Sequence, residues 1–297
     1  MRDKTYRSGR QILLGQDNNA LVLLFAINML LFLMLQFISI VYFISDTPRE
    51  FFQRQILDWF TLPANFEVFI SRPWTLFTYM FTHFSIWHLI SSMLWLWCFG
   101  YILQDLAGNR HLIPVYLYGG FTGAVIFLTA IQFLPASQQP AATIPWMGAG
   151  AAVMAVATAT TALSPNYRLF PLINGGIPLW IITVVYALIH FSTLGSAQMG
   201  IGAASLAAGA VGYMYVHLLQ RGTDAGAWMS NLYQQVNSWF QPGLQPFQKR
   251  QPTGKQPYVK IPKSTQQRLD EILDKINQQG MDGLTPEEKE FLRKASE

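Results

Sequence analysis

Long apolar runs alternate with short polar junctions along the first three quarters of the chain. Six runs of about 20 residues are dominated by Ala, Leu, Ile, Phe and Trp, and a helix of that length crosses a hydrocarbon layer of about 30 Å. The pattern therefore predicts an all-α membrane protein with six transmembrane helices. The runs lie at residues 20–44, 84–103, 112–134, 144–163, 172–190 and 199–219.

The segment between the first two runs, Ser45–His83, is long, rich in aromatic residues and poor in charge. Long loops in compact domains are usually functional or disordered, and this one is too apolar for disorder. Its Trp and Phe content is typical of short helices half-sunk in the membrane interface. We expect an interfacial first loop, and an ordinary exposed loop is the alternative.

After the sixth run the chain becomes first amphipathic and then polar. Trp228, Leu232 and Val236 recur at helical spacing with almost no charge around them, which favours a helix on the membrane surface. Residues 241–263 hold five prolines among Gln, Lys and Gly, a composition typical of a linker. Residues 221–263 are therefore predicted to be an interfacial helix followed by a Pro-rich linker.

The last segment, 264–297, carries two short helical patterns. Ile272 and Ile276 belong to an apolar stripe at helical spacing, and Thr285-Pro286-Glu287-Glu288 has the form of a helix N-cap with a capping-box glutamate. The pattern predicts a small helical hairpin. Because its stripe is too small for a robust core, we expect it to dock on a partner or on the rest of the chain.

The distribution of basic residues predicts the orientation. The tail at 1–19 and the junctions with Arg110 and Arg168 are basic, whereas the junctions at 137–143 and 192–198 contain no Lys or Arg. By the positive-inside rule, both termini are cytoplasmic. The membrane domain then spans residues 20–220.

Charge and cysteine content exclude some classes of protein. The formal net charge of +4 belongs largely to the tails, so it indicates contact with an anionic lipid surface and not with nucleic acid. The single cysteine, Cys98, lies inside a membrane run and rules out an intrachain disulfide.

A motif surrounds the start of the second run. Trp74 precedes two histidines five residues apart, His83 and His88, and Ser92 follows four residues later. This block resembles the region in which rhomboid intramembrane proteases enter their second helix. Members of that family usually have an asparagine where this chain has Ser92.

The resemblance continues through the later runs. Gly100 and Gly108 match two family glycines that flank a helix end, and Gln104 stands where a glutamate is usual. The similarity covers residues of about 20 to 220, with all six runs and their spacing. It implies a six-helix rhomboid-like bundle, which we place in a bacterial inner membrane.

The catalytic positions of the family are changed in this chain. Rhomboids cut with a serine at the start of the fourth helix and a histidine on the sixth, and the matching positions here hold Gly150 and Ser205. Met154 stands where a tyrosine often stacks on the histidine. Gly148 and Gly212 match small residues of the fourth and sixth helices.

These changes remove the chemistry that the resemblance would otherwise imply. A serine protease needs a base that takes the hydroxyl proton and fixed donors that hold the oxyanion. Gly150 offers no nucleophile, and the oxyanion region at His88 and Ser92 lacks its asparagine. Loss of a dyad member in soluble serine proteases lowers the rate about a million-fold. The resemblance therefore implies a pseudoprotease that binds transmembrane segments of client proteins, as inactive rhomboids and derlins do.

Two other functions remain open at this stage. An active intramembrane protease could use Ser205 as a non-standard nucleophile, with His88 or His83 as its base. A structural membrane subunit would instead bind fixed partners. The segment at 264–297 could present a cytoplasmic docking surface in any of these cases.

The two histidines of the motif have a plainer interpretation. We expect His83 and His88 to be satisfied polar residues that hold the second helix to the first loop, although ionisable groups inside a membrane are often functional. A metal site lacks a third ligand, because no intramembrane carboxylate accompanies them. We therefore predict neither metal nor cofactor.

Overall fold

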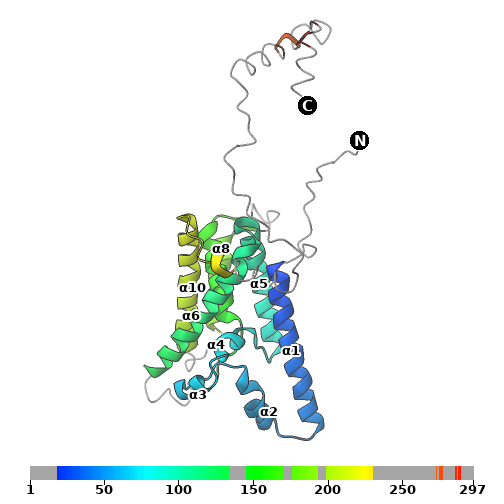
Figure 1. Cartoon of the computed structure of the whole chain (residues 1–297), viewed down its shortest axis with the longest axis vertical. Helices are drawn as coiled ribbons and strands as arrows, with labels where there is room; N and C mark the ends of the chain where they lie inside the picture. Colours follow the sequence, from blue (N-terminus) through cyan, green and yellow to red (C-terminus); the bar gives the residue numbers. More distant parts are fainter. Residues whose placement is uncertain are drawn as a thin grey trace. The chain divides into compact units, whose positions relative to one another are not determined.

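The computed structural model describes residues 19–133, 145–169, 176–192 and 199–229, together with a few positions near the C-terminus (Figure 1). The chain divides into two units, Met1–Trp239 and Phe240–Glu297. Residues 1–18 of the predicted N-terminal tail lie outside the described residues, as do the linker at 241–263 and most of the C-terminal hairpin. Each unit is considered by itself.

Six helices of at least 14 residues in the described part of the first unit follow the six apolar runs. They are α1 (Ala20–Ile44), α5 (Ile86–Ala107), α6 (Leu112–Gln132), α8 (Gly150–Leu163), α9 (Leu179–Ser192) and α10 (Met199–Gln220). Among the described residues, four helices are long and apolar enough to cross a membrane, and they correspond to α1, α5, α6 and α10. The helices α8 and α9 have 14 residues each, or about 21 Å.

Two of the predicted runs begin their helices later than the apolar pattern indicates. The run at 144–163 forms a helix only from Gly150, because Trp146 exchanges two backbone hydrogen bonds of 2.8 Å with Leu62 of the first loop. In the described part of the run at 172–190, helix α9 begins at Leu179. Strand β2 (Ile177–Pro178) precedes it and pairs antiparallel with β1 (Arg168–Leu169). The sequence predicted an all-α chain, and the structure adds two short β pairings: the bridge between Leu62 and Trp146, and the pair β1–β2.

The first loop folds into the short helices that the sequence predicts. They are α2 (Arg49–Gln55), η2 (Leu57–Trp59), α3 (Phe66–Ser71), α4 (Thr75–Thr78) and η3 (Tyr79–Phe81). Phe52 and Leu57 are buried against Leu35 of α1, whereas Trp59 and Trp74 stack on each other at 5.7 Å between ring centroids and remain half exposed. The loop thus has a packed side and an exposed aromatic side, as an interfacial segment requires.

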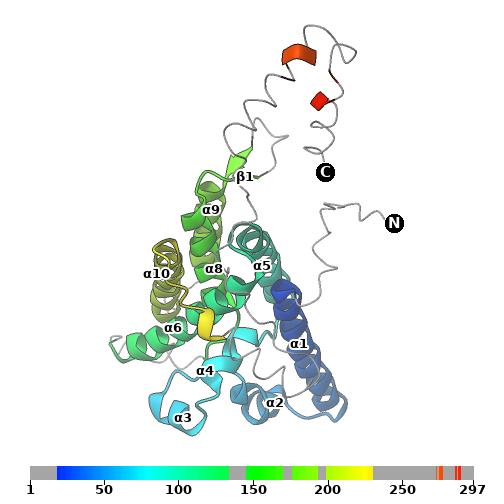
Figure 2. The same ribbon diagram turned by 45° about the horizontal axis from the view of Figure 1, so that its top comes forward.

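Helix α8 occupies the centre of the first unit and contacts α5, α6, α9 and α10. Figure 2 shows α10 and α5 on opposite sides of α8, with α1 beyond α5. The close packing depends on small residues: a side-chain carbon on Gly119 or Gly123 of α6 would collide with Ala155 or Ala151 of α8. Small residues let helix backbones approach closely inside a membrane. The start of α8 is thereby fixed against its neighbours.

The described part of the C-terminal unit contains the predicted helix cap. The backbone N–H of Thr285 donates to Glu288 Oε2 at 2.8 Å, and the N–H of Glu288 donates to Thr285 Oγ1 at 3.4 Å. These bonds, together with Lys275, lower the pKa of the Glu288 carboxyl. Lys275 Nζ lies 3.0 Å from Glu288 Oε1 and joins the two predicted helices of the hairpin.

Candidate functional site

The first turn of α8 lies against a histidine of α9. A side-chain carbon placed on Gly150 would lie 2.7 Å from Cε1 of His190, which is closer than side chains approach one another. His190 belongs to the last turn of α9. Its imidazole therefore occupies the space that a side chain at position 150 would need.

The same imidazole is hydrogen-bonded to the serine of α10. His190 Nε2 lies 2.9 Å from Ser205 Oγ, and the Ser205 side chain is fully buried. From the sequence, His88 or His83 was the expected base for Ser205; in the structure the imidazole hydrogen-bonded to Ser205 is that of His190. The sequence pattern gave no reason to pair His190 with Ser205, because His190 lies at a helix end, yet the fold brings α9 and α10 together at this level.

His83 and His88 lie against the two residues that precede α8, Ala149 and Gly148 respectively. His83 is fully buried; its Nε2 accepts from the Ala149 N–H at 3.4 Å and its Nδ1 lies 3.3 Å from the Phe81 carbonyl oxygen. This geometry fits a neutral imidazole with its proton on Nδ1. The His88 ring packs edge-on against His83 at 5.2 Å. His83 thus links the first loop to α8, and its predicted role as a satisfied polar residue fits these contacts.

A cavity of about 480 Å³ opens beside the α8 start. Its walls come from α5, α9, the beginning of α10 and the segment that precedes α8. Most of its lining is aromatic or aliphatic, and its polar side chains come from α5 and α9. The lining residues are Trp87, His88, Ser91, Ser92, Trp95, Pro145, Trp146, Met147, Gly150, Tyr186, Ile189, His190 and Ile201.

Ser205 does not line this cavity. It borders a separate apolar groove of about 620 Å³ between α8, α9 and α10, together with Met154 and Phe191. The His190 imidazole therefore lies between the cavity and the Ser205 hydroxyl. Because of this order, a segment bound in the cavity meets imidazole first and does not reach the hydroxyl directly.

The other residues singled out in the sequence lie away from the cavity. Trp74 belongs to the exposed stack of the first loop and donates its indole N–H to the Trp59 carbonyl oxygen at 3.0 Å. Gly100 packs against Leu21 of α1. Gly108 ends α5 with a φ of +95°, a conformation that favours glycine.

Gly148, Met154 and Gly212 are closer to the site. Gly148 has a φ of +108°, and a side-chain carbon there would lie 2.5 Å from Cε1 of His88. Met154 is buried beside Gly209 of α10. Gly212 meets the backbone of α8 at Ala155. These residues shape the site by keeping space free, which is a structural and not a chemical contribution.

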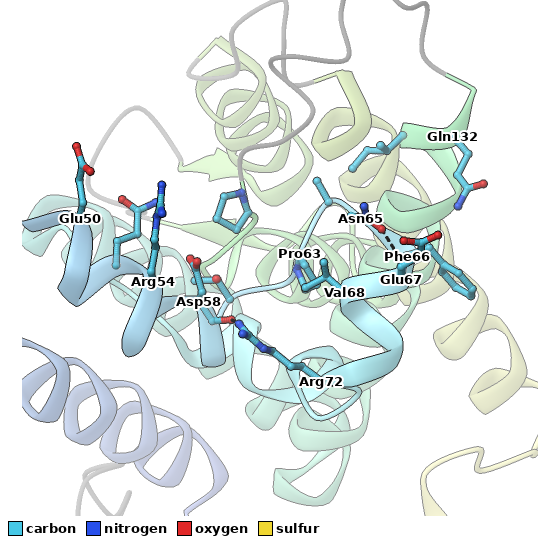
Figure 3. A pocket seen from close by; sticks show the side chains of 15 residues that line it. Glu50, Arg54, Asp58, Pro63, Asn65, Phe66, Glu67, Val68, Arg72 and Gln132 are labelled. Carbon is cyan, nitrogen blue, oxygen red and sulfur yellow. Dashed lines mark hydrogen bonds between the residues drawn. The ribbon is translucent and has the colours of Figure 1, made fainter.

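A larger cavity, of about 930 Å³, lies in the first loop, where it meets the end of α6 (Figure 3). Charged side chains of both signs line it, including Glu50, Arg54, Asp58 and Glu67. The Arg72 guanidinium donates to the Asp58 carbonyl oxygen at 3.2 Å and lies over the Trp59 ring. Burial raises the pKa of the Asp58 carboxyl, although nearby arginines oppose that shift. Pro145 borders both cavities.

Within the described ranges, no group of three His, Cys, Asp or Glu side chains could hold a metal ion.

Comparison with known families decides which fold this is. The Rhomboid domain family matches residues 71–222, which are 152 of the 297 residues and include α5, α6, α8, α9 and α10. The chain belongs to the rhomboid family. A second family, of unknown function (DUF6576), matches residues 258–297. Those residues correspond to the predicted C-terminal hairpin and the end of the linker.

One curated rhomboid relative is similar to part of this chain. It is RHOMBOID-like protein 12, mitochondrial, from Arabidopsis thaliana, which is 30% identical over 109 residues. The match covers 34% of this chain and 32% of the relative. The chain thus spans about a third of the length of that relative.

Membership of the rhomboid family and the apolar helices together indicate an integral membrane protein. The resemblance to rhomboid proteases singled out Gly150 and Ser205 but not His190. A signal was present, because His190 is an ionisable residue at the end of an apolar run, and such residues are functional candidates inside membranes. What the sequence did not show is that α9 places this imidazole between the two positions.

Proposed function

We propose that this rhomboid is a pseudoprotease that binds a membrane-spanning segment of a client protein. The segment lies against the cavity between α5, α9 and the start of α8. The observation that carries this proposal is the contact between Gly150 and His190. The nucleophile position has no side chain, and a neighbouring imidazole fills the space in which a serine would act.

The cavity suits a membrane segment better than a small soluble ligand. Trp87 and Ile189 lie at its rim and are 77% and 46% exposed, so the rim is apolar and faces the surroundings of the helices. An apolar segment that enters from the bilayer gains little from leaving lipid, so close packing and a few polar contacts hold it.

The proposal includes a topology. All six helices cross or enter the membrane of a bacterial cell, with the short α8 enclosed by its neighbours and both termini in the cytoplasm. In this arrangement the first-loop cavity lies on the outer side, and residues 264–297 lie where a cytoplasmic partner can bind. The basic N-terminal tail and the basic residues Arg110 and Arg168 support this orientation.

Site-specific crosslinking tests client binding. A photoreactive amino acid at Trp87 or Ile189 should crosslink to a single-span test protein in the same liposomes, because both positions line the cavity. The matched control is Val125 of α6, which is 49% exposed but does not line the cavity next to α8. Equal crosslinking at Val125 would show random contact in the bilayer and contradict the proposal.

The hydrogen bond between His190 and Ser205 favours a second candidate function. In this alternative, Ser205 is the nucleophile and His190 the base of an active intramembrane hydrolase. The pair has the required distance of 2.9 Å. The full burial of Ser205 and its position behind the imidazole make this function the weaker candidate.

A serine-reactive probe separates the two functions. We expect a fluorophosphonate to leave the wild-type protein unlabelled in membranes, because Ser205 has no exposed surface even though it borders the apolar groove. A buried hydroxyl without access does not reach the phosphorus atom even when a base is adjacent. Labelling that disappears in both Ser205→Ala and His190→Ala variants would instead establish the hydrolase and overturn the pseudoprotease proposal.

A further inference from the structure

The polar end of the cavity lies at the start of α8, where the His88 imidazole lies against Gly148 and the His190 imidazole lies against Gly150. Ser91 and Ser92 of α5 also line the cavity and add two hydroxyl groups. None of its lining residues is Lys, Arg, Asp or Glu. The cavity therefore combines an apolar entrance with imidazole and hydroxyl groups that carry no fixed charge.

The two imidazoles flank the start of α8. His88 lies against Gly148, and His190 lies against Gly150. The imidazole of His190 is already hydrogen-bonded to Ser205. The His88 imidazole is open to the cavity and packs edge-on against the buried His83 ring. His88 is thus the imidazole best placed to meet a bound segment.

The start of α8 adds a positive electrostatic potential to this end of the cavity. The N-cap residue Ala149 provides no side-chain hydrogen bond, and no acidic residue lies in the first turn. The first N–H groups of a helix without such a cap favour a negatively charged or hydrogen-bond-accepting group nearby. Gly150, the first residue of the helix, itself lines the cavity.

We propose that the recognised client carries an aspartate or glutamate within its membrane-spanning segment. The carboxyl group hydrogen-bonds to the His88 imidazole at the start of α8, and His190 lines the same cavity. This inference rests on the proposed function, because it names the kind of segment that the cavity selects.

The surroundings favour a carboxyl group over other polar side chains. A lysine ammonium would meet the positive end of α8 and two imidazoles, with no carboxylate in the cavity lining to pair with it. A purely apolar segment would leave the polar end of the cavity without a partner. Burying polar groups without hydrogen bonds costs free energy. A carboxyl group inside a membrane is itself costly and gains from an imidazole partner.

Binding of designed peptides to the full-length protein in lipid nanodiscs tests this inference. The probes are fluorescent transmembrane peptides of leucine and alanine, identical except for one residue that is Leu, Glu, Gln or Lys. For each polar residue, three peptides are made that carry it at three different positions along the transmembrane segment. In one of the three, the polar residue should lie at the same depth in the bilayer as His88. We expect the best glutamate peptide to bind at least about tenfold more tightly than the leucine peptide, and more tightly than the Gln and Lys peptides.

Variants show whether the preference arises at His88. His88→Phe keeps the ring and removes its nitrogens, so it should abolish the preference for Glu while the leucine peptide still binds. The matched control is His217→Phe, which alters an imidazole stacked on Tyr213 of α10 away from the cavity lining. This control should keep the full preference for Glu.

The outcomes separate this inference from the function on which it rests. If the wild type binds the Leu, Glu and Gln peptides equally, client binding stands and the carboxyl preference is wrong. A preference for Glu that survives His88→Phe also overturns the inference. If no peptide binds at any depth, both the client-binding function and the inference fail.

Discussion

A Gly150→Ser, Ser205→His double variant should remain inactive toward a transmembrane rhomboid substrate, although it introduces the two side chains that the resemblance to rhomboid proteases implies at these positions. The reason is His190. A side-chain carbon at position 150 already lies 2.7 Å from its Cε1, and a serine hydroxyl would extend further into the ring. Because this carbon is fixed by the backbone, no serine rotamer relieves the contact, and the imidazole or the backbone must move.

A third substitution, His190→Ala, should raise the cleavage rate of the double variant. His190→Ala removes the ring and opens the volume in which the introduced serine and the introduced histidine can form a hydrogen bond. Because loss of a dyad member costs about a million-fold in soluble serine proteases, even a poorly aligned pair should be measurable. We expect the triple variant to cleave at least about tenfold faster than the double variant, within an upper limit set by the altered oxyanion region at Ser92.

Cleavage is measured in liposomes with purified protein and a labelled single-span substrate. The control is a triple variant with Gly150→Ala in place of Gly150→Ser, which has nearly the same packing but no hydroxyl, and which should stay inactive. If the double and triple variants cleave equally fast, His190 does not block the serine position. The contact between Gly150 and His190 would then no longer support the proposed function.

The sequence alone predicted where the long helices lie, but it did not predict the residue at which each helix begins. Apolar runs determine that a segment is helical and buried, so α1, α6 and α10 were placed within a few residues. The start of α8 was misplaced because Trp146 pairs with Leu62, a residue more than 80 positions earlier in the chain. Hydrophobic pattern carries no information about such a pairing.

The candidate site was predicted in part for a similar reason. Gly150 and Ser205 were singled out because the motifs around them resemble short rhomboid motifs that can be matched along the sequence. His190 was not paired with Ser205 because their proximity depends on how α9 is placed relative to α10, and no short motif encodes that placement. The polar contacts expected of His83 include the Ala149 N–H, a partner that became apparent only in three dimensions.

The close approach of α8 and α10 should make Gly212 one of the least replaceable residues of the protein. A side-chain carbon at Gly212 would overlap the Ala155 carbonyl oxygen and lie 2.7 Å from Thr158 Oγ1. The obstacle is backbone and not the end of a flexible side chain, so the two helices would have to separate. We expect Gly212→Ala to destabilise the fold by about 3 kcal/mol or more, because overpacked cores force backbone shifts.

Gly200 provides a matched comparison within the same helix. A side-chain carbon there would meet Ile131 and Phe127 no closer than 3.5 Å, which is ordinary contact. Gly200→Ala should therefore be neutral or stabilise the protein by up to about 1 kcal/mol, since alanine favours helix more than glycine does. Thermal unfolding in detergent, followed by circular dichroism, compares the two variants with the wild type. Similar midpoints for Gly212→Ala and Gly200→Ala would mean that α8 and α10 are packed less closely than described, and that the position of Ser205 relative to α8 must be revised.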